Sequence, residues 1–158
     1  MSERRRAIVI GAGTIGRIHI DALRRNNIEL ASIVNLTPER SLAGAEQFGA
    51  ERGDPDLATA LRHAGADTLH VCTPDTTHFD FTAQALKAGL NVVCEKPLTA
   101  DAPSAGELYR IAADSGAVHA ICFNNRYYTL LQELASLRRG GAFDRIFLVR
   151  ASVADDTF

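Results

Sequence analysis

A glycine-rich turn near the start of the chain constrains the fold more than any other feature. Residues 7–10 are apolar, glycines follow with the spacing G-x-G-x-x-G, and a helical pattern begins at once. Gly11 allows a tight turn, Gly13 lets the backbone approach a phosphate, and Gly16 lets a helix pack close to the strand. The helix N-terminus would then favour an anion. The pattern predicts a dinucleotide-binding turn, whose expected cofactor contacts are Gly11, Gly13, Thr14, Ile15 and Gly16.

Apolar segments and helical patterns alternate along most of the chain. The apolar segments are rich in Val and Ile, as strands buried on both faces should be. Strands are predicted at 6–10, 29–35, 68–72, 91–94 and 117–123, with a weaker one at 50–53. Helices are predicted at 14–25, 38–48, 56–64, 76–88 and 101–115. Strands and helices that alternate with short connections predict an α/β fold with a doubly wound parallel sheet, the Rossmann arrangement.

The C-terminal tail breaks this alternation. A helix is predicted at 129–139, a Gly-Gly break follows, and 145–153 alternates like a strand with large apolar residues on both faces. Such a strand needs neighbours, so it should either fray or pair with the same strand of a second copy. We expect a dinucleotide-binding Rossmann domain at 1–125. Residues 126–158 would be a linker helix and the first strand of a C-terminal α+β domain that is otherwise missing.

Composition excludes several classes of protein. Hydrophobic residues make up 46% of the 158 residues, charged residues make up 23%, and the formal net charge is −2. Nothing here favours nucleic acid or a membrane as a partner, and the apolar run at 7–10 is too short for a signal peptide. Cys72, Cys94 and Cys122 lie in or beside apolar segments without the spacing of metal ligands. The three cysteines are therefore predicted to pack in the core as free thiols, in a reducing cytoplasm, and no metal site is expected.

A second motif closes the strand predicted at 91–94. Glu95, Lys96 and Pro97 follow it directly, so Lys96 is expected at the carboxyl end of a parallel strand, where such sheets bind their ligands. Lysine suits proton transfer there, because its pKa falls readily on partial burial. A solvated surface lysine is the alternative interpretation.

The glycine turn, the segment C-T-P-D-T-T-H at 72–78 and the motif E-K-P occur in this order. Together they resemble the N-terminal portion of the Gfo/Idh/MocA-family oxidoreductases, whose members are similar to glucose–fructose oxidoreductase and inositol dehydrogenase. The resemblance extends over essentially the whole chain, through N-R-Y at 125–127 and G-A-F-D-R-I at 141–146. It implies that a substrate domain, an antiparallel sheet with an acid/base histidine, lies beyond Phe158. It also implies a homo-oligomer in the full-length form.

The resemblance implies roles for several residues. Lys96 would hold the substrate hydroxyl near the nicotinamide and assist proton transfer, and Glu95 would support it beside the cofactor. The peptide bond before Pro97 would be cis. Arg126 would face the substrate, a sugar or polyol-like molecule; a plain surface arginine is the alternative.

Four residues near the glycine turn and the strand at 68–72 carry open alternatives. Thr73 and Pro74 should run beside the nicotinamide ribose or pyrophosphate, with Thr73 as a hydrogen-bond donor. His78 begins a helix, where a cap or packed residue competes with a cofactor contact. His19 lies on the apolar stripe of the first helix, which favours a packed core histidine.

Asn35 occupies the place of the acidic residue that usually binds the adenosine ribose. An amide can still bond a ribose hydroxyl but does not repel a 2′-phosphate, and Thr37 and Arg40 lie within reach of one. The cofactor is therefore predicted as NAD or NADP, with Asn35 and Arg40 among its contacts.

The favoured function is the NAD(P)-binding domain of an oxidoreductase that moves hydride between nicotinamide and a sugar, polyol or related hydroxy compound. As this fragment it should be inactive, because one wall of the substrate site is missing. The alternative is a non-catalytic dinucleotide-binding regulatory module, since fold does not dictate function. An interaction domain without a ligand fits the intact glycine turn least well.

Overall fold

The computed structural model describes residues 5–146, 148–150 and 152. It divides into two compact units, Met1–Cys122 and Phe123–Phe158. The division lies close to the domain boundary expected after residue 125.

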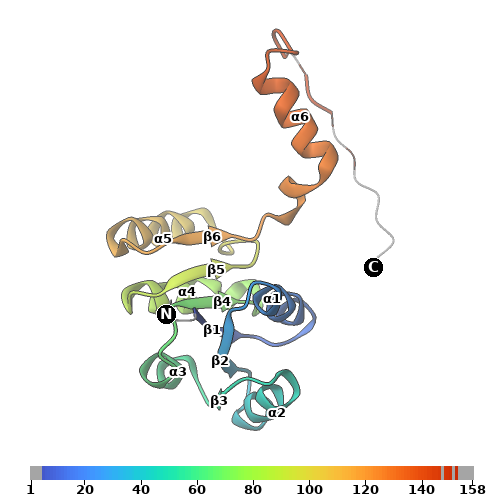
Figure 1. The fold of residues 1–158 in the computed structure, drawn as a ribbon. Helices are drawn as coiled ribbons and strands as arrows, with labels where there is room; N and C mark the ends of the chain where they lie inside the picture. Colours follow the sequence, from blue (N-terminus) through green and yellow to red (C-terminus); the bar gives the residue numbers. More distant parts are fainter. Residues whose placement is uncertain (1–4, 147, 151, 153–158) are drawn as a thin grey trace. The chain divides into compact units, whose positions relative to one another are not determined.

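The first unit is a parallel sheet wrapped by helices, with strand order β3-β2-β1-β4-β5-β6 (Figure 1). Every neighbouring pair of strands is parallel. The strands are β1 (Arg6–Ile10), β2 (Glu29–Val34), β3 (Arg52–Asp54), β4 (Thr68–Val71), β5 (Asn91–Cys94) and β6 (His119–Ile121). The helices are α1 (Thr14–Arg25), α2 (Pro38–Phe48), α3 (Leu57–His63), α4 (His78–Lys87) and α5 (Ala102–Ser115), with a 3-10 turn η1 (Asp75–Thr77) before α4. The predicted doubly wound Rossmann arrangement is confirmed.

Two apolar cores hold the layers together. α1 and α2 cover one face of the sheet, and α3, α4 and α5 cover the other (Figure 1). Ile8, Leu69 and Val71 of the central strands are fully buried on the α3–α5 side. Val9 and Ile33 are buried on the opposite side, against Ile20 of α1. Side chains of one strand thus alternate between the two cores, which is why both faces of these strands read as apolar.

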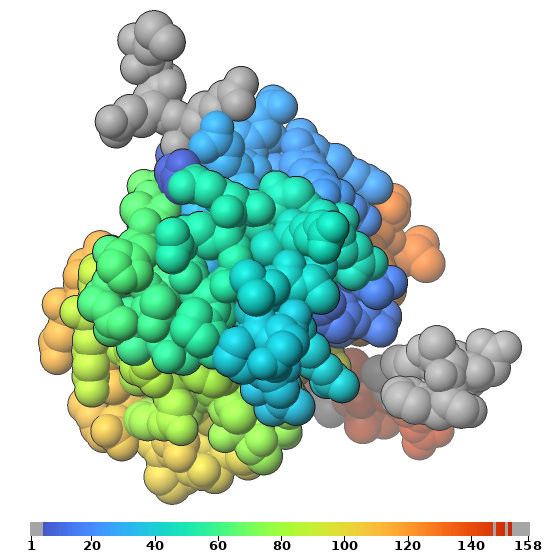
Figure 2. Space-filling view, turned by 90° about the horizontal axis from the view of Figure 1, so that it is seen from below, coloured from blue at the N-terminus to red at the C-terminus, as the bar shows by residue number. Residues whose placement is uncertain are grey.

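Local sequence signals explain where the helices begin. Asp56 and Asp101 cap α3 and α5, since each carboxylate accepts the N–H group three residues later, at 2.7 Å and 2.8 Å. Thr37 caps α2 in the same way, with Pro38 as its first residue. Seen from the β3 edge, residues of α2 and α3 form the surface of the unit (Figure 2).

Several predicted element ends were wrong by one or two residues. β6 covers only His119–Ile121 of the predicted 117–123, because β6 is an edge strand that pairs with β5 alone. The helix predicted at 76–88 is preceded by the η1 turn and begins as α4 at His78. β3 lies slightly later than expected, at Arg52–Asp54. None of these changes moves a strand to another place in the sheet.

The second unit contains the 3-10 turn η2 (Asn124–Tyr127) and the helix α6 (Thr129–Arg139), as predicted for 129–139. The described residues of the segment predicted as a strand at 145–153 form no strand. A strand needs a neighbour to pair its N–H and C=O groups, and no other strand exists among the described residues of this unit. Residues 147, 151 and 153 of that prediction lie outside the described residues. Across the described ranges, no helix combines the length and apolarity needed to span a bilayer.

Candidate functional site

The glycines between β1 and α1 have different steric requirements. Gly11 has φ +87°, which favours glycine, and a Cβ there would lie 2.7 Å from the carbonyl oxygen of Cys72. A Cβ at Gly16 would lie 2.1 Å from the carbonyl oxygen of Gly11, so α1 begins in direct backbone contact with the turn. Nothing lies within 4 Å of the place that a Cβ would take at Gly13. The turn is packed on its protein side and open at Gly13.

The N-terminus of α1 has the properties of an anion site. Gly13 is its N-cap and makes no side-chain cap bond, and the first turn contains no acidic residue. Within the described part of the chain, the N–H groups of Gly13, Thr14 and Ile15 donate no hydrogen bond to the protein. These donors and the helix dipole point to phosphate binding at this end.

The turn opens into a groove of about 550 Å³ at the carboxyl ends of β1, β2 and β4. Parallel sheets bind ligands at this edge, where the strand order reverses. Of the predicted cofactor residues, the groove is lined by Gly11, Gly13, Asn35, Thr73 and Pro74. Its apolar walls come from residues that the sequence did not single out, Leu36, Pro55, Leu57 and Phe81. No motif marks these four, because only the order of the strands brings them together.

The amide of Asn35 connects the glycine turn to α2. Its Oδ1 accepts the N–H of Ala12 at 3.0 Å, and its Nδ2 donates to the carbonyl oxygen of Arg40 at 3.1 Å. The backbone N–H of Asn35 donates to the hydroxyl of buried Ser41 at 2.8 Å. Asn35 therefore sits in the predicted place with its amide already bonded on both sides, while the Arg40 side chain is exposed.

Thr73 lies after β4 with its hydroxyl partly used. Thr77 Oγ1 lies 2.7 Å from Thr73 Oγ1 and 2.7 Å from the Pro74 carbonyl oxygen. The carbonyl can only accept and the Thr77 hydroxyl has one proton, so Thr77 donates to Pro74 and Thr73 donates to Thr77. The Thr73 oxygen can still accept a hydrogen bond, its expected role as a donor to the cofactor stays a prediction, and Thr77, which also lines the groove, is a partner that the sequence did not reveal.

Lys96 follows β5 at the same edge of the sheet. Its side chain is exposed, and the peptide bond between Lys96 and Pro97 is cis. Among the described residues, no hydrogen bond or ion pair involves the Lys96 amine. The amine is accordingly placed at the expected edge and is not occupied by a protein partner.

Glu95 turns inward instead of toward the groove. Its Oε1 pairs with His19 Nε2 at 3.0 Å, and its Oε2 accepts the backbone N–H of Lys96 at 3.2 Å. Burial alone would raise the pKa of Glu95, but hydrogen bonds from His19, from the Cys122 thiol and from the Lys96 backbone outweigh it and lower the pKa. His19 is buried, as predicted, but it is a bonded partner of Glu95 and not merely a packed residue.

The donor atoms of His19, Glu95 and Cys122 all lie within 4.8 Å of one another, a spacing that a metal ion could bridge. Each of them is already engaged in the hydrogen bonds just described. Burial and the neighbouring Glu95 raise the pKa of Cys122 to about 11, which disfavours the thiolate that a metal would need. The cluster is best described as a buried hydrogen-bonded group behind Lys96.

His78 was among the predicted cofactor contacts, and the structure gives it another place. The residue is 1% exposed, its Nδ1 lies 2.7 Å from the Pro97 carbonyl oxygen, and its Nε2 lies 2.8 Å from that of Thr73. The ring has almost no surface and no unused polar atom for a cofactor. It connects the two loops that flank the groove, since its helix begins directly beneath them.

Arg126 belongs to the second unit. It lies in η2, and its guanidinium stands 5.8 Å from the centroid of the Tyr127 ring. Its predicted contact with substrate stays a prediction.

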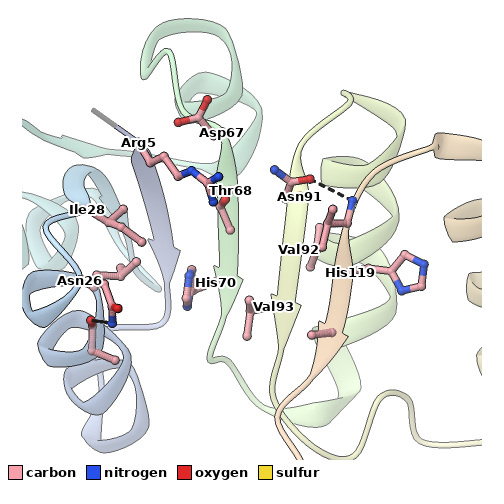
Figure 3. Close-up of a pocket in the computed structure, with 14 residues that line it drawn as sticks. Arg5, Asn26, Ile28, Asp67, Thr68, His70, Asn91, Val92, Val93 and His119 are labelled. Atoms are coloured by element: carbon pink, nitrogen blue, oxygen red, sulfur yellow. Dashed lines mark hydrogen bonds between the residues drawn. The ribbon is translucent and has the colours of Figure 1, made fainter. Parts of the chain in front are cut away.

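A further pocket, of about 590 Å³, lies beside α1 over β4, β5 and β6 (Figure 3). Asp67, Thr68 and Asn91 line it at the amino ends of their strands, and His70 lies farther along β4 (Figure 3). Ligands of doubly wound sheets bind at the opposite, carboxyl edge. The groove at the glycine turn is therefore the candidate site.

Comparisons with known proteins agree with this geometry. The D-glucoside 3-dehydrogenase of Escherichia coli (strain K12) is 30% identical over 92% of this chain and 42% of its own length. The inositol 2-dehydrogenase of Rhizobium meliloti (strain 1021) is 31% identical over 75% of this chain and 36% of its own length. The chain thus spans less than half the length of these relatives.

Solved structures show the same fold. The WlbA dehydrogenase from Chromobacterium violaceum, solved with NADH and UDP-GlcNAcA, is similar with a TM-score of 0.85 and 27% identity, over 93% of this chain and 43% of that one. GenD2 from gentamicin A biosynthesis, solved with NAD, gives a TM-score of 0.78 and 31% identity, over 88% of this chain and 41% of that one. The family model described as "Oxidoreductase family, NAD-binding Rossmann fold" matches residues 5–123. The chain belongs to this Gfo/Idh/MocA oxidoreductase family.

Proposed function

We propose that this chain is the cofactor-binding portion of an NAD-dependent dehydrogenase that acts on a sugar or polyol. The observation that carries the proposal is the N-terminus of α1. Three N–H groups there have no acceptor within the described protein, and the space beside Gly13, which lines the groove, is open. A pyrophosphate supplies both the charge and the acceptors that this arrangement lacks. The sugar- and polyol-acting relatives support the substrate class.

Different parts of the groove suit different parts of a dinucleotide. Gly11, Gly13 and the start of α1 would hold the pyrophosphate, and the apolar wall with Leu36 and Leu57 would receive the adenine. Thr73 Oγ1 would accept a hydrogen bond from a ribose hydroxyl of the nicotinamide half. When bound, nicotinamide accepts or returns a hydride. Asn35 has no charge to repel a 2′-phosphate, so NADP is a second candidate cofactor.

Lys96 would handle the proton that accompanies hydride transfer. Its amine extends from the carboxyl edge of β5 and has no partner among the described residues. As a neutral amine it can accept the proton of a substrate hydroxyl, and as an ammonium it can return that proton in the reverse reaction.

We further propose that Arg126 contacts the substrate and that 126–158 begins a second domain. That domain would complete the substrate site and mediate an oligomer. The three free cysteines suit the cytoplasm.

Titration calorimetry of the chain with NAD+, NADH and NADP+ tests the cofactor site. We expect binding, and we expect Gly13→Val to abolish it, because the side chain would occupy the open space where the phosphates approach. Gly106→Val is the matched control, since Gly106 also has nothing within 4 Å of a Cβ but lies in α5. No heat with any cofactor from a folded sample would overturn the proposal.

Turnover of the full-length protein tests the activity. We expect Lys96→Ala to lower kcat about a hundred- to ten-thousandfold while cofactor affinity survives, as for other acid–base residues. Lys87→Ala, in the last turn of α4, replaces the other lysine of these 158 residues and should behave like wild type. A protein that binds cofactor but turns over no sugar or polyol would instead be the non-catalytic binding module.

A further inference from the structure

The turn that carries Lys96 is held from two sides by buried histidines. β5 ends at Cys94, and the next three residues, Glu95, Lys96 and Pro97, form the turn. The backbone of Glu95 still bonds to β4, through its N–H to the Val71 carbonyl at 2.9 Å. Among the described residues, the other hydrogen bonds of the turn involve side chains.

The first anchor runs from α1. His19 is 7% exposed, and its Nε2 lies 3.0 Å from Glu95 Oε1. The other carboxylate oxygen of Glu95 accepts the N–H of Lys96 at 3.2 Å. One carboxylate therefore joins the His19 ring to the backbone of Lys96. A buried carboxylate needs such partners, since an unpaired one would be costly.

The His19 ring is itself fixed at its second nitrogen. His19 Nδ1 lies 2.9 Å from His70 Nδ1, and the two rings meet edge to face with centroids 5.2 Å apart. Burial, followed by the neighbouring His19, lowers the pKa of His70 to about 4, so His70 is neutral near pH 7. With a partner at each nitrogen, the ring of His19 has one orientation.

The second anchor comes from the start of α4. His78, at 1% exposure, faces the carbonyl oxygens of Pro97 at 2.7 Å and Thr73 at 2.8 Å. Both partners are carbonyl oxygens, which only accept, so a ring N–H is the donor in such a contact. His78 thereby connects the residue after Lys96 to the loop after β4.

The result is a lysine with a fixed backbone and an unoccupied amine. Lys96 lies between Glu95, held by His19, and Pro97, held by His78, while its side chain is exposed. We propose that His19 and His78 are positioning residues that hold the Lys96 backbone so that its amine meets the substrate hydroxyl. Neither ring touches the reacting atoms. The inference rests on the proposed catalytic role of Lys96.

Steady-state kinetics of the full-length enzyme test the inference. We expect His19→Leu and His78→Leu each to lower kcat about a hundredfold with little change in the KM for cofactor, because a misplacement of about 1 Å can cost that much. His19→Gln, whose amide can still donate to Glu95, should restore most of the rate. His63→Leu, at an exposed histidine in the last turn of α3, is the matched control.

Amide hydrogen exchange by NMR gives a readout that does not depend on turnover. The Lys96 amide should be protected in the wild-type chain, exchange faster in His19→Leu and recover in His19→Gln. If the Leu variants do not fold, amide exchange and kcat of the wild type and of His19→Gln test the inference instead. An unprotected wild-type amide, wild-type kcat in a folded His19→Leu enzyme, or no rescue by Gln would overturn the inference. Failure of Lys96→Ala to lower kcat would instead overturn the proposed function.

Discussion

Acid should destabilise the first unit through one histidine, His70. It lies on β4 beneath α1, and burial, followed by the charge of His19, lowers its pKa from 6.5 to about 4. In the unfolded chain the ring takes up a proton as the pH falls through 6.5, whereas in the folded protein it stays neutral until about pH 4. Between about pH 6.5 and pH 4 the unfolded state therefore binds more protons than the folded state. The free energy of unfolding decreases as the pH is lowered through this range.

The size of the effect follows from the two pKa values. Each pKa unit corresponds to about 1.4 kcal/mol, so the shift makes His70 responsible for a loss of about 3 kcal/mol in unfolding free energy below pH 4. At pH 5 about 2 kcal/mol of this should already be lost. Because native domains are stable by only about 5–15 kcal/mol, such a loss is easily measured.

Urea unfolding at about pH 7.5 and pH 5 measures this loss of unfolding free energy, in the wild-type chain and in His70→Asn. The Asn side chain keeps a polar partner near His19 Nδ1 but does not titrate. We expect the drop in unfolding free energy between the two pH values to be about 2 kcal/mol smaller in His70→Asn than in wild type. His63→Asn, at an exposed histidine, should leave the drop unchanged. Equal drops in wild type and His70→Asn would refute the burial argument.

Three further predictions concern the site and its surroundings. Asn35→Asp should raise the ratio of the affinity for NAD to the affinity for NADP by about tenfold, because the carboxylate repels a 2′-phosphate. Calorimetry with both cofactors measures this ratio, and an unchanged ratio would show that residue 35 does not contact the adenosine ribose. Gly16→Ala should destabilise the fold by about 3 kcal/mol, since its Cβ would lie 2.1 Å from the Gly11 carbonyl oxygen; a thermal melt equal to that of Gly106→Ala would contradict this. Burial and Glu95 raise the pKa of Cys122 to about 11, so iodoacetamide should alkylate this thiol at least tenfold more slowly at pH 8 in the folded chain than in the urea-unfolded chain. Mass spectrometry measures both rates, and equal rates would contradict this prediction.

The fold followed from local signals in the sequence. The G-x-G-x-x-G spacing and the alternation of Val-rich strands with capped helices determined the layers, since each depends on neighbouring residues. The position of Lys96 at the carboxyl edge followed from the same alternation. The described residues of 145–153 form no strand, because alternation shows that a segment could pair, not that a partner is present.

The support behind Lys96 could not be predicted in this way. His19 and Glu95 are separated by 76 positions, and hydrophobic periodicity shows only that His19 faces inward. Which buried polar group meets it depends on the packing of α1 over β4 and β5. His78 shows the same limit, because the T-P-x-x-x-H motif places it near the groove without showing that its ring turns beneath the loops.

The backbone contacts around Gly11 bear on the thermodynamics of binding. A Cβ at Gly11 would meet the Cys72 carbonyl and a Cβ at Gly16 would meet the Gly11 carbonyl, so the turn, the loop after β4 and α1 are in close backbone contact. A loop that is already rigid loses little conformational entropy when a ligand arrives. We therefore expect the cofactor to bind with only a small unfavourable entropy from ordering of the turn, and its affinity to fall when that packing is loosened, even by changes that touch no atom of the ligand.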